Sequence, residues 1–193
     1  MAKQFHVSVK GNDTWAGSAE RPFRTIQQAA NYAKAGDTII VHEGVYREHV
    51  NPRNGGISDQ ERITYEAAPG EKVVISGAEV IKDWIKVKGN VYKTVLPNTF
   101  FGDFNPYKEI VWGDWFLSKD GPFHLGEVYI NGKSMFEAKS LEDVMDPKPF
   151  PKAREPEWSV HNWYCETDDQ NTTIYANFGE YNPLENVIEI NVR

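Results

Sequence analysis

The sequence predicts a mainly β protein that starts as a parallel β-helix capped by a short α-helix, with an inserted or flanking antiparallel β-sandwich-like region. Within residues 22–48 a capped helix runs into β-branched residues, and strand-like stretches then recur at a nearly constant interval. From about residue 81, strands separated by turn residues favour hairpins. We therefore expect the cap and first rungs in residues 1–80, the sandwich-like region in 81–185, and a strand returning to the β-helix in 186–193.

The helix is predicted by its cap and its apolar face. Thr25 is a good N-cap, and Gln28 stands three residues later, where a capping box requires it. Gly36 is placed to end the helix in the left-handed conformation. One narrow face carries apolar, mostly small side chains, namely Ile26, Ala29, Ala30 and Ala33. Because so short a helix is not stable alone in water, we expect it to cover the open end of the β-helix.

Two pairs of similar strands predict successive rungs of a solenoid. Residues 39–41 are echoed 24 positions later by residues 63–65, and residues 48–50 are echoed about 25 positions later by residues 73–75. A short β-meander is the alternative interpretation. A solenoid needs roughly three or more repeats to be stable, so we expect further rungs after Arg193.

The region after residue 81 contains two predicted hairpins. Asn131-Gly132 between the alternating strands of residues 127–138 favours a type I′ turn. A second hairpin is predicted over residues 163–178. Four prolines in residues 146–156 exclude helix there and predict a surface loop. Further strands are predicted at residues 84–87, 91–95, 109–112 and 187–192.

Composition and charge exclude several classes of partner. The 28 acidic and 21 basic residues give a net charge of −7, so neither nucleic acid nor an anionic membrane surface is an expected partner. Cys165 is the only cysteine, which excludes an intrachain disulfide and a cysteine-based metal site. The five histidines show no zinc-site spacing. We therefore expect no metal and no other cofactor.

The sequence also bears on location and assembly. The N-terminal residues lack the apolar run of a signal peptide, and no stretch is long enough to span a membrane. A cytoplasmic location is expected, although the trimmed start of a secreted protein would look similar. The sequence leaves open whether the protein forms homo-oligomers.

Several motifs are shared with known carbohydrate enzymes. The first half carries V-S-x-x-G-N-D at residues 7–13, P-F-x-T-I at 22–26, G-D-T-I at 36–39 and G-V-Y-R-E at 44–48. These motifs resemble the start of right-handed parallel β-helix enzymes, including polysaccharide lyases and several glycoside hydrolase families. Later segments such as RITYEAAPGEKVVISGAE, NTFFGDFNPYKEIVWGDWF and HLGEVYINGKSMFE resemble the N-terminal region of the glycoside hydrolase family 120 β-xylosidases.

The resemblance covers essentially the whole chain and implies a function. It implies a retaining glycoside hydrolase with two catalytic carboxylates, acting on xylo-oligosaccharides in xylan degradation. No Asp or Glu of this chain matches the family's catalytic motif, so we assign no catalytic residue. The carboxylates are expected beyond Arg193, and the remaining C-terminal β-helix of the same enzyme is the expected partner. The 193-residue segment alone is predicted to be inactive.

The aromatic stretch of residues 100–125 is the best candidate for contact with substrate. It places aromatic rings among Gly, Asp, Asn and Pro, as in a shaped loop, and such rings stack on the faces of sugars. We predict that Trp115 and Trp112 line the sugar site and that His124 hydrogen-bonds a hydroxyl group. A core role for Trp112 and a structural role for His124 are the alternatives. Four nearby acids could supply a catalytic carboxylate pair, but we interpret them as exposed or turn-capping residues: Asp103, Glu109, Asp114 and Asp120.

Two other functions remain open at this point. A polysaccharide lyase would need Ca²⁺ or a basic residue to acidify the proton next to a uronate. The acids of residues 37–76 are scattered among turns, which disfavours a calcium site there. A non-catalytic carbohydrate-binding or structural β module would fold and bind sugar without further sequence.

Overall fold

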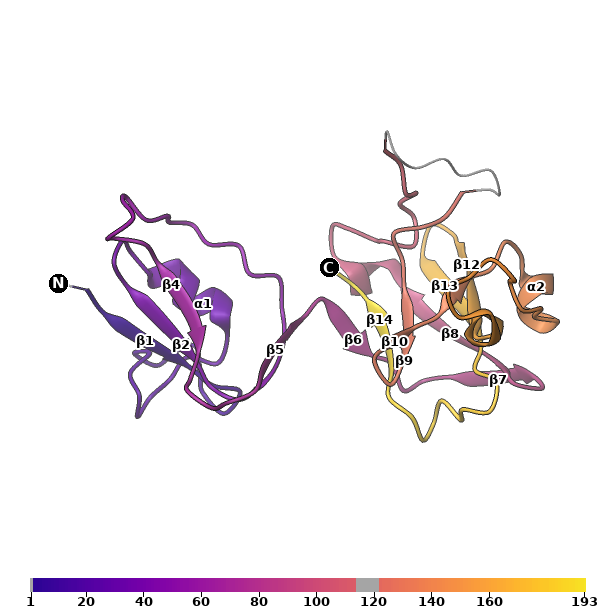
Figure 1. Ribbon diagram of the computed structural model, residues 1–193, viewed down its shortest axis with the longest axis horizontal. Helices are drawn as coiled ribbons and strands as arrows, with labels where there is room; N and C mark the ends of the chain where they lie inside the picture. Colours follow the sequence, from indigo (N-terminus) through magenta and orange to yellow (C-terminus); the bar gives the residue numbers. More distant parts are fainter. Residues whose placement is uncertain (1, 114–121) are drawn as a thin grey trace. The chain divides into compact units, whose positions relative to one another are not determined.

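The computed structural model describes residues 2–113 and 122–193 and divides the chain into two compact units, Met1–Gly77 and Ala78–Arg193. We call these the first unit and the second unit. Both are mainly β with few short helices (Figure 1). In the described part of the chain, no helix combines the length and apolar character needed to cross a membrane.

The first unit contains one helix and two small parallel sheets. Its elements are β1 (Gln4–Val7), α1 (Ile26–Tyr32), β2 (Thr38–Val41), β3 (Gly44–Arg47), β4 (Thr64–Ala67) and β5 (Val73–Ser76). One sheet has the strand order β1-β2-β4, and the other pairs β3 with β5. Parallel pairing is the arrangement expected between rungs, but these short open sheets do not form a parallel β-helix, which stays a prediction.

The register of the parallel pairs differs from the predicted one. Ile39 pairs with Tyr65 rather than with Ile63. Likewise, β5 pairs with β3, which ends at Arg47, and not with residues 48–50. The predicted offsets are therefore wrong. Register is set by which face of each strand is buried and by the turns between strands, and a local likeness of two apolar stretches contains neither.

The helix α1 begins where the sequence predicts. Thr25 is its N-cap, and the hydroxyl oxygen of Thr25 accepts a hydrogen bond from the main-chain N–H of Gln28 at 3.1 Å. The reciprocal half of the predicted capping box is wrong. The side chain of Gln28 donates instead to the main-chain oxygen of Asp13 at 2.8 Å, and the Asp13 carboxylate accepts the Thr25 N–H at 2.9 Å. Asp13 thus performs the role expected of Gln28.

The helix ends earlier than predicted. Tyr32 is its last residue, and Ala33 is already extended, with φ −61° and ψ 141°. Gly36 does adopt the left-handed conformation, with φ +86°, but in the turn before β2 and not at the end of the helix. The turn forms because the carboxylate of Asp37 accepts the main-chain N–H of Lys34 at 2.9 Å, which draws the chain away from the helix axis.

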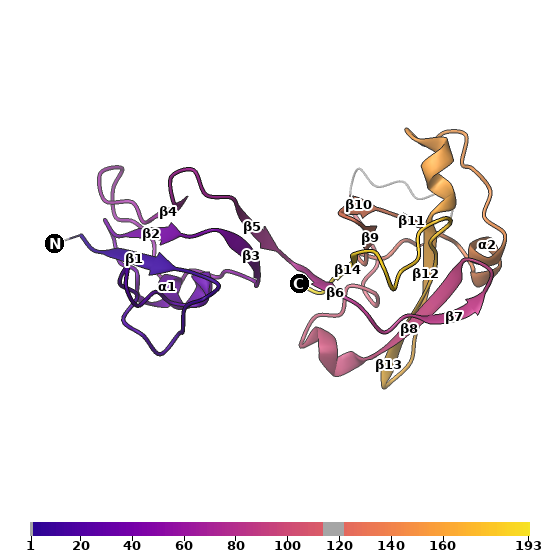
Figure 2. The ribbon, with the colours of Figure 1, turned by 90° about the horizontal axis from the view of Figure 1, so that it is seen from below.

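One core fills the first unit. The predicted apolar face of α1 is buried along its length and lies against β1 and β2 (Figure 2). Alanines on this face let the helix approach the strands closely. The core residues are Val7, Phe23, Ile26, Ala29, Ala33, Ile39, Val41 and Tyr46.

Residues 78–113 and 122–193 of the second unit form two sheets. The four-stranded sheet has the order β10-β9-β14-β6, with β6 (Ala78–Val80), β9 (Val128–Ile130), β10 (Lys133–Ser134) and β14 (Ile188–Asn191). The five-stranded sheet has the order β11-β12-β13-β8-β7, with β7 (Ile85–Lys88), β8 (Val91–Pro97), β11 (Phe136–Glu137), β12 (Asn162–Thr167) and β13 (Asn171–Asn177). Its short helices are α2 (Leu141–Met145) and the 3₁₀ helices η1 (Asn98–Phe101) and η2 (Pro156–Val160).

Both predicted hairpins are confirmed. β9 and β10 pair around Asn131 and Gly132, whose φ angles of 50° and 79° suit a type I′ turn. β12 and β13 pair antiparallel, and the Asp168 carboxylate accepts the main-chain N–H groups of the turn at 2.7 Å. The last predicted strand is β14, which pairs with β6 and β9 inside the second unit.

The two sheets of the second unit share one hydrophobic core. Trp163 and Ile174 come from the five-stranded sheet and Val128 and Ile190 from the four-stranded sheet, and all four are buried. Trp84, predicted to open a strand, instead precedes β7 and lies in this core. The proline-rich loop runs between α2 and η2 without regular structure, as predicted, except that its last residue, Pro156, begins η2.

Candidate functional site

The described ends of the aromatic stretch form a short two-stranded arm in the second unit. Ile110 and His124 pair in an isolated antiparallel bridge, flanked by main-chain hydrogen bonds of 2.7 and 2.8 Å. The strand predicted over residues 109–112 is thus reduced to this bridge. We call residues 109–112 and 123–125 the aromatic arm.

A largely buried carboxylate holds the arm. Glu137 in β11 accepts a hydrogen bond from the main-chain N–H of His124 at 2.8 Å, and its second oxygen lies 2.5 Å from His124 Nδ1. The Glu137 side chain is 10% exposed and that of His124 is 22% exposed. A carboxylate only accepts hydrogen bonds, so His124 Nδ1 carries the proton. Both contacts are charge-assisted, the stronger class of protein hydrogen bond.

A thiol lies next to this pair but is chemically inert. Cys165 in β12 has its Sγ 3.8 Å from His124 Nδ1, and its S–H donates to the main-chain oxygen of Tyr107 at 3.7 Å. Burial, followed by the charges of Glu137 and Glu166, raises the pKa of the Cys165 thiol to about 12. The thiol therefore stays protonated near neutral pH, which excludes a nucleophilic role.

The predicted sugar-binding residues have different surroundings. Trp112 lies in the arm with 89% of its surface exposed, so the alternative that it is a core residue is wrong. Trp115 lies outside the described residues. His124 lies in the arm, with its main-chain N–H and Nδ1 both held by Glu137. Glu137 itself was missed by sequence reasoning, because nothing in a 13-residue separation marks it as the partner of His124.

A pocket of about 910 Å³ adjoins the arm. Phe123 of the arm and Glu137 both line it, together with Phe150, which is 51% exposed. Trp158 also lines the pocket, but Lys133 Nζ lies 4.2 Å from its ring centroid and the His161 ring stacks on it at 4.1 Å. Trp158 is thus engaged within the fold, and among the described residues of the arm and this pocket the exposed aromatic rings are those of Trp112 and Phe150.

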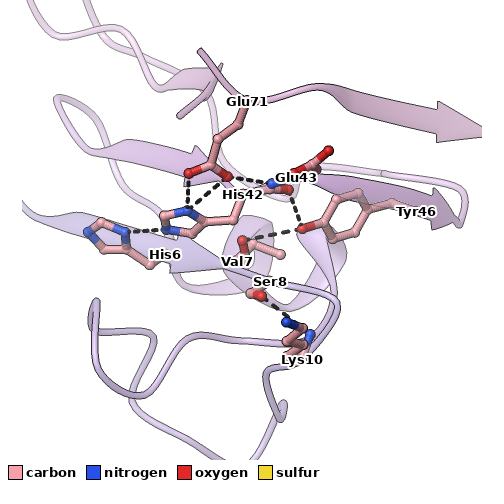
Figure 3. Close-up of polar contacts among 8 residues, drawn as sticks. All are labelled: His6, Val7, Ser8, Lys10, His42, Glu43, Tyr46 and Glu71. Atoms are coloured by element: carbon pink, nitrogen blue, oxygen red, sulfur yellow. Dashed lines mark hydrogen bonds and ion pairs between the residues drawn. The ribbon is translucent and has the colours of Figure 1, made fainter. Parts of the chain in front are cut away.

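The first unit holds a second polar cluster, in which three side chains lie in a row (Figure 3). His6 Nδ1 lies 3.0 Å from His42 Nε2, and His42 Nδ1 lies 3.2 Å from a carboxylate oxygen of Glu71. The two imidazole rings are stacked, with centroids 5.3 Å apart. Since the carboxylate accepts from His42 Nδ1–H, His42 Nε2 accepts from His6 Nδ1–H.

This row of side chains joins successive parallel strands. His6 belongs to β1, His42 follows β2, and Glu71 lies between β4 and β5. Burial and the proximity of His42 lower the pKa of His6. Both ring nitrogens of His42 have side-chain partners, and among residues 2–113 and 122–193 no group of three or more His, Cys, Asp or Glu could hold a metal ion. The row is thus a structural link.

Comparison with known proteins gives relatives for each region. The family described as "Glycoside hydrolase 120, insertion domain" matches residues 81–190, and "Protein of unknown function (DUF1565)" matches residues 9–53. The uncharacterized protein YwoF of Bacillus subtilis is 40% identical over 75 residues, which are 39% of this chain and 16% of YwoF. The pectate lyase PEL9 of Emericella nidulans is 32% identical over 82 residues, which are 42% of this chain and 20% of PEL9.

One solved structure matches both units. It is described as "The complex structure of XylC with xylose", is 49% identical, and superposes with a TM-score of 0.95 over 98% of this chain. The chain spans about a third of XylC, 32% of its length, and smaller shares of the two curated relatives. Since the insertion-domain profile covers more than half of the sequence, the chain belongs to glycoside hydrolase family 120.

Proposed function

We propose that this chain is part of a retaining β-xylosidase that removes xylose from xylo-oligosaccharides. The observation that carries the proposal is the likeness to XylC, whose structure contains xylose, at 49% identity over 98% of this chain. The two catalytic carboxylates lie outside residues 1–193. This agrees with the share of XylC that the chain spans and with the exposed positions of Asp103 and Glu109.

In this proposal the first unit begins a right-handed parallel β-helix. β4 is exposed along its whole length, and Tyr65, Val74 and Ile75 present apolar surface on β4 and β5. A hollow of about 220 Å³ with mostly apolar walls lies among these strands and α1. An unpaired strand edge with exposed apolar side chains favours pairing with a further strand. The remaining rungs of the same enzyme would cover this surface.

The aromatic arm then supplies one wall of the sugar site. Trp112 is 89% exposed at the end of the arm, and its indole offers an apolar face that suits the C–H face of a pyranose. Trp115 and His124 are proposed to act beside it. The indole would stabilise the bound sugar and the transition state equally. Loss of the stacking should therefore raise KM more than it lowers kcat.

Substitution of Trp112 tests this role. In the complete protein, Trp112→Ala should raise KM for xylobiose by roughly tenfold, the equivalent of about 1.4 kcal/mol. Trp112→Phe keeps an aromatic face and should restore most of the affinity. Wild-type KM in Trp112→Ala would exclude contact between this ring and the substrate. The 193-residue chain alone is proposed to be inactive, and turnover of an aryl-xyloside by it would contradict that.

A second candidate function is a polysaccharide lyase, favoured by the 32% identity with pectate lyase PEL9. A lyase would cleave polygalacturonate to unsaturated products that absorb ultraviolet light, and would depend on Ca²⁺ or on a basic residue. Assays of the complete protein with xylobiose and with polygalacturonate plus Ca²⁺ separate the two reactions. A chain that binds sugar without either activity would instead be a carbohydrate-binding module.

A further inference from the structure

We infer that Glu137 is a positioning residue for substrate binding, because it fixes the aromatic arm and thereby the direction in which Trp112 meets the sugar. The inference depends on the proposed function for the role of Trp112. It does not depend on it for the anchoring itself, which is a property of the second unit.

The backbone around Glu137 is fixed by hydrogen bonds to the five-stranded sheet. β11 pairs parallel with β12, and the residues on both sides of Glu137 donate main-chain hydrogen bonds to β12 and to the residue just before it. Phe136 N–H donates to the main-chain oxygen of His161 at 3.0 Å, and Ala138 N–H donates to that of Trp163 at 2.7 Å. Trp163 is 2% exposed in the core of the second unit. The backbone that carries the carboxylate is therefore held on either side by the five-stranded sheet.

Besides Glu137, Asn191 of β14 holds the arm, because its side-chain amide donates to the main-chain oxygen of Leu125 at 2.9 Å. Ile110 is 38% exposed and Leu125 is 43% exposed, so the arm buries only part of its apolar surface. The Glu137 carboxylate instead binds His124, which is the bridge partner of Ile110. Ile110 lies two residues before Trp112. A shift of His124 would therefore move Ile110, and with it the segment that carries the Trp112 indole.

The chemistry of the contact distinguishes anchoring from mere packing. Glu137→Ala removes both acceptors and leaves the His124 N–H and Nδ1–H without them. Glu137→Gln keeps one acceptor for the N–H, and its amide can donate to Nδ1 once His124 takes the other neutral tautomer. An anchoring role therefore predicts that Gln rescues much of what Ala loses, whereas a role of the negative charge predicts that both fail.

The test uses the complete protein and two readouts. Glu137→Ala should raise KM for xylobiose roughly tenfold with a much smaller change in kcat, and Glu137→Gln should stay nearer the wild type. Main-chain amides of residues 109–111 and 123–125 should exchange hydrogen faster in Glu137→Ala, while amides of β12 and β13 keep their protection. Glu142→Ala removes an exposed carboxylate from the same pocket and serves as the matched control.

Each outcome decides one statement. Wild-type KM and wild-type exchange in the arm of Glu137→Ala would overturn the inference while leaving the proposed function intact. Faster exchange in a protein that does not cleave xylobiose even as wild type would contradict the proposed function and retain the anchor. If Glu137→Ala does not fold, His124→Ala removes the side-chain part of the contact from the arm side and should speed hydrogen exchange of the same arm amides. Wild-type exchange of the arm amides in a folded His124→Ala would also overturn the inference.

Discussion

The carboxylate of Glu48 caps the helix α1 by accepting the main-chain N–H of Ile26 at 2.9 Å. Its second oxygen accepts the N–H of Gln27 at 2.8 Å. The first N–H groups of a helix have no partner within the helix, and a negative charge there also complements the helix dipole. Glu48 directly follows β3. One side chain thus ties the helix to the second pair of parallel strands.

Loss of this cap should loosen the helix. We predict that Glu48→Ala lowers the free energy of opening of α1 by about 1–2 kcal/mol, because two N–H groups lose their acceptors. Hydrogen exchange of the α1 amides in the complete protein measures this directly. Glu61→Ala, at an exposed position of the same unit, is the control and should leave the exchange unchanged. Equal exchange in wild type and Glu48→Ala would show that the cap contributes nothing.

Two glycines of the second unit should differ in their tolerance of alanine. A Cβ on Gly126 would lie 2.5 Å from the ring of Tyr107, which is fully buried and donates through its hydroxyl to the main-chain oxygen of Glu127 at 2.7 Å. Gly132 has φ +79° but open space around it. We predict that Gly132→Ala costs about 1 kcal/mol of backbone strain. Gly126→Ala should cost more, roughly 2–3 kcal/mol of overpacking.

Protection of the β12 and β13 amides against hydrogen exchange ranks these two variants. A smaller loss of protection in Gly126→Ala than in Gly132→Ala would contradict the prediction. It would mean that Tyr107 moves aside easily despite its burial and its hydrogen bond.

The first unit should become less stable in acid. The pKa of His6 lies below its ordinary value of 6.5 because of burial and His42, although Glu20 opposes the shift. The unfolded chain then binds the proton more readily, so the contribution of His6 is complete above pH 6.5 and declines as the pH falls below it. The pKa of Glu71 is also lowered, first by the main-chain N–H of Glu43 and then by His42. Its contribution is lost at still lower pH.

A pH series of urea unfolding, followed in the first unit, measures this effect. The midpoint should fall between pH 7 and pH 5 in the wild type, and His6→Phe should flatten the fall because it keeps a stacking ring without the proton. The same pH dependence in both proteins would exclude His6 as its source.

Cys165 should resist alkylation in the folded protein. Burial at 5% exposure and a thiol pKa raised to about 12 leave almost no thiolate at neutral pH. Peptide mapping after iodoacetamide treatment should find Cys165 unmodified until denaturant is added. A cysteine introduced by Lys152→Cys, at an exposed loop position, should react without denaturant and controls for the reagent. Rapid native-state labelling of Cys165 would contradict its assignment as a structural thiol.

Local features of this fold were predictable from the sequence. The Thr25 cap, the Asn131-Gly132 turn and the proline-rich loop each depend on neighbouring residues alone, and the structure contains all three. The end of the helix was predicted less well. The Asp37 carboxylate accepts the main-chain N–H of Lys34, and the chain turns there, so the helix ends before Gly36.

Contacts between distant residues were not predictable in this way. The Glu48–Ile26 cap, the Glu137–His124 anchor and the Ile39–Tyr65 register all join positions far apart in the chain. Which residues meet in these contacts depends on how whole strands pack, and a local motif or a sequence spacing does not specify that packing. The exposure of Trp112 belongs to the same class, since a tryptophan after an apolar strand reads equally well as core.

The most direct test of the proposed β-xylosidase activity is the anomer that the complete protein first releases from xylobiose, followed by NMR. A retaining mechanism with two carboxylates predicts β-xylose as the first product, which then mutarotates. Release of α-xylose first would contradict retention. Absence of xylose, together with unsaturated products from polygalacturonate, would contradict the glycosidase assignment and favour the lyase.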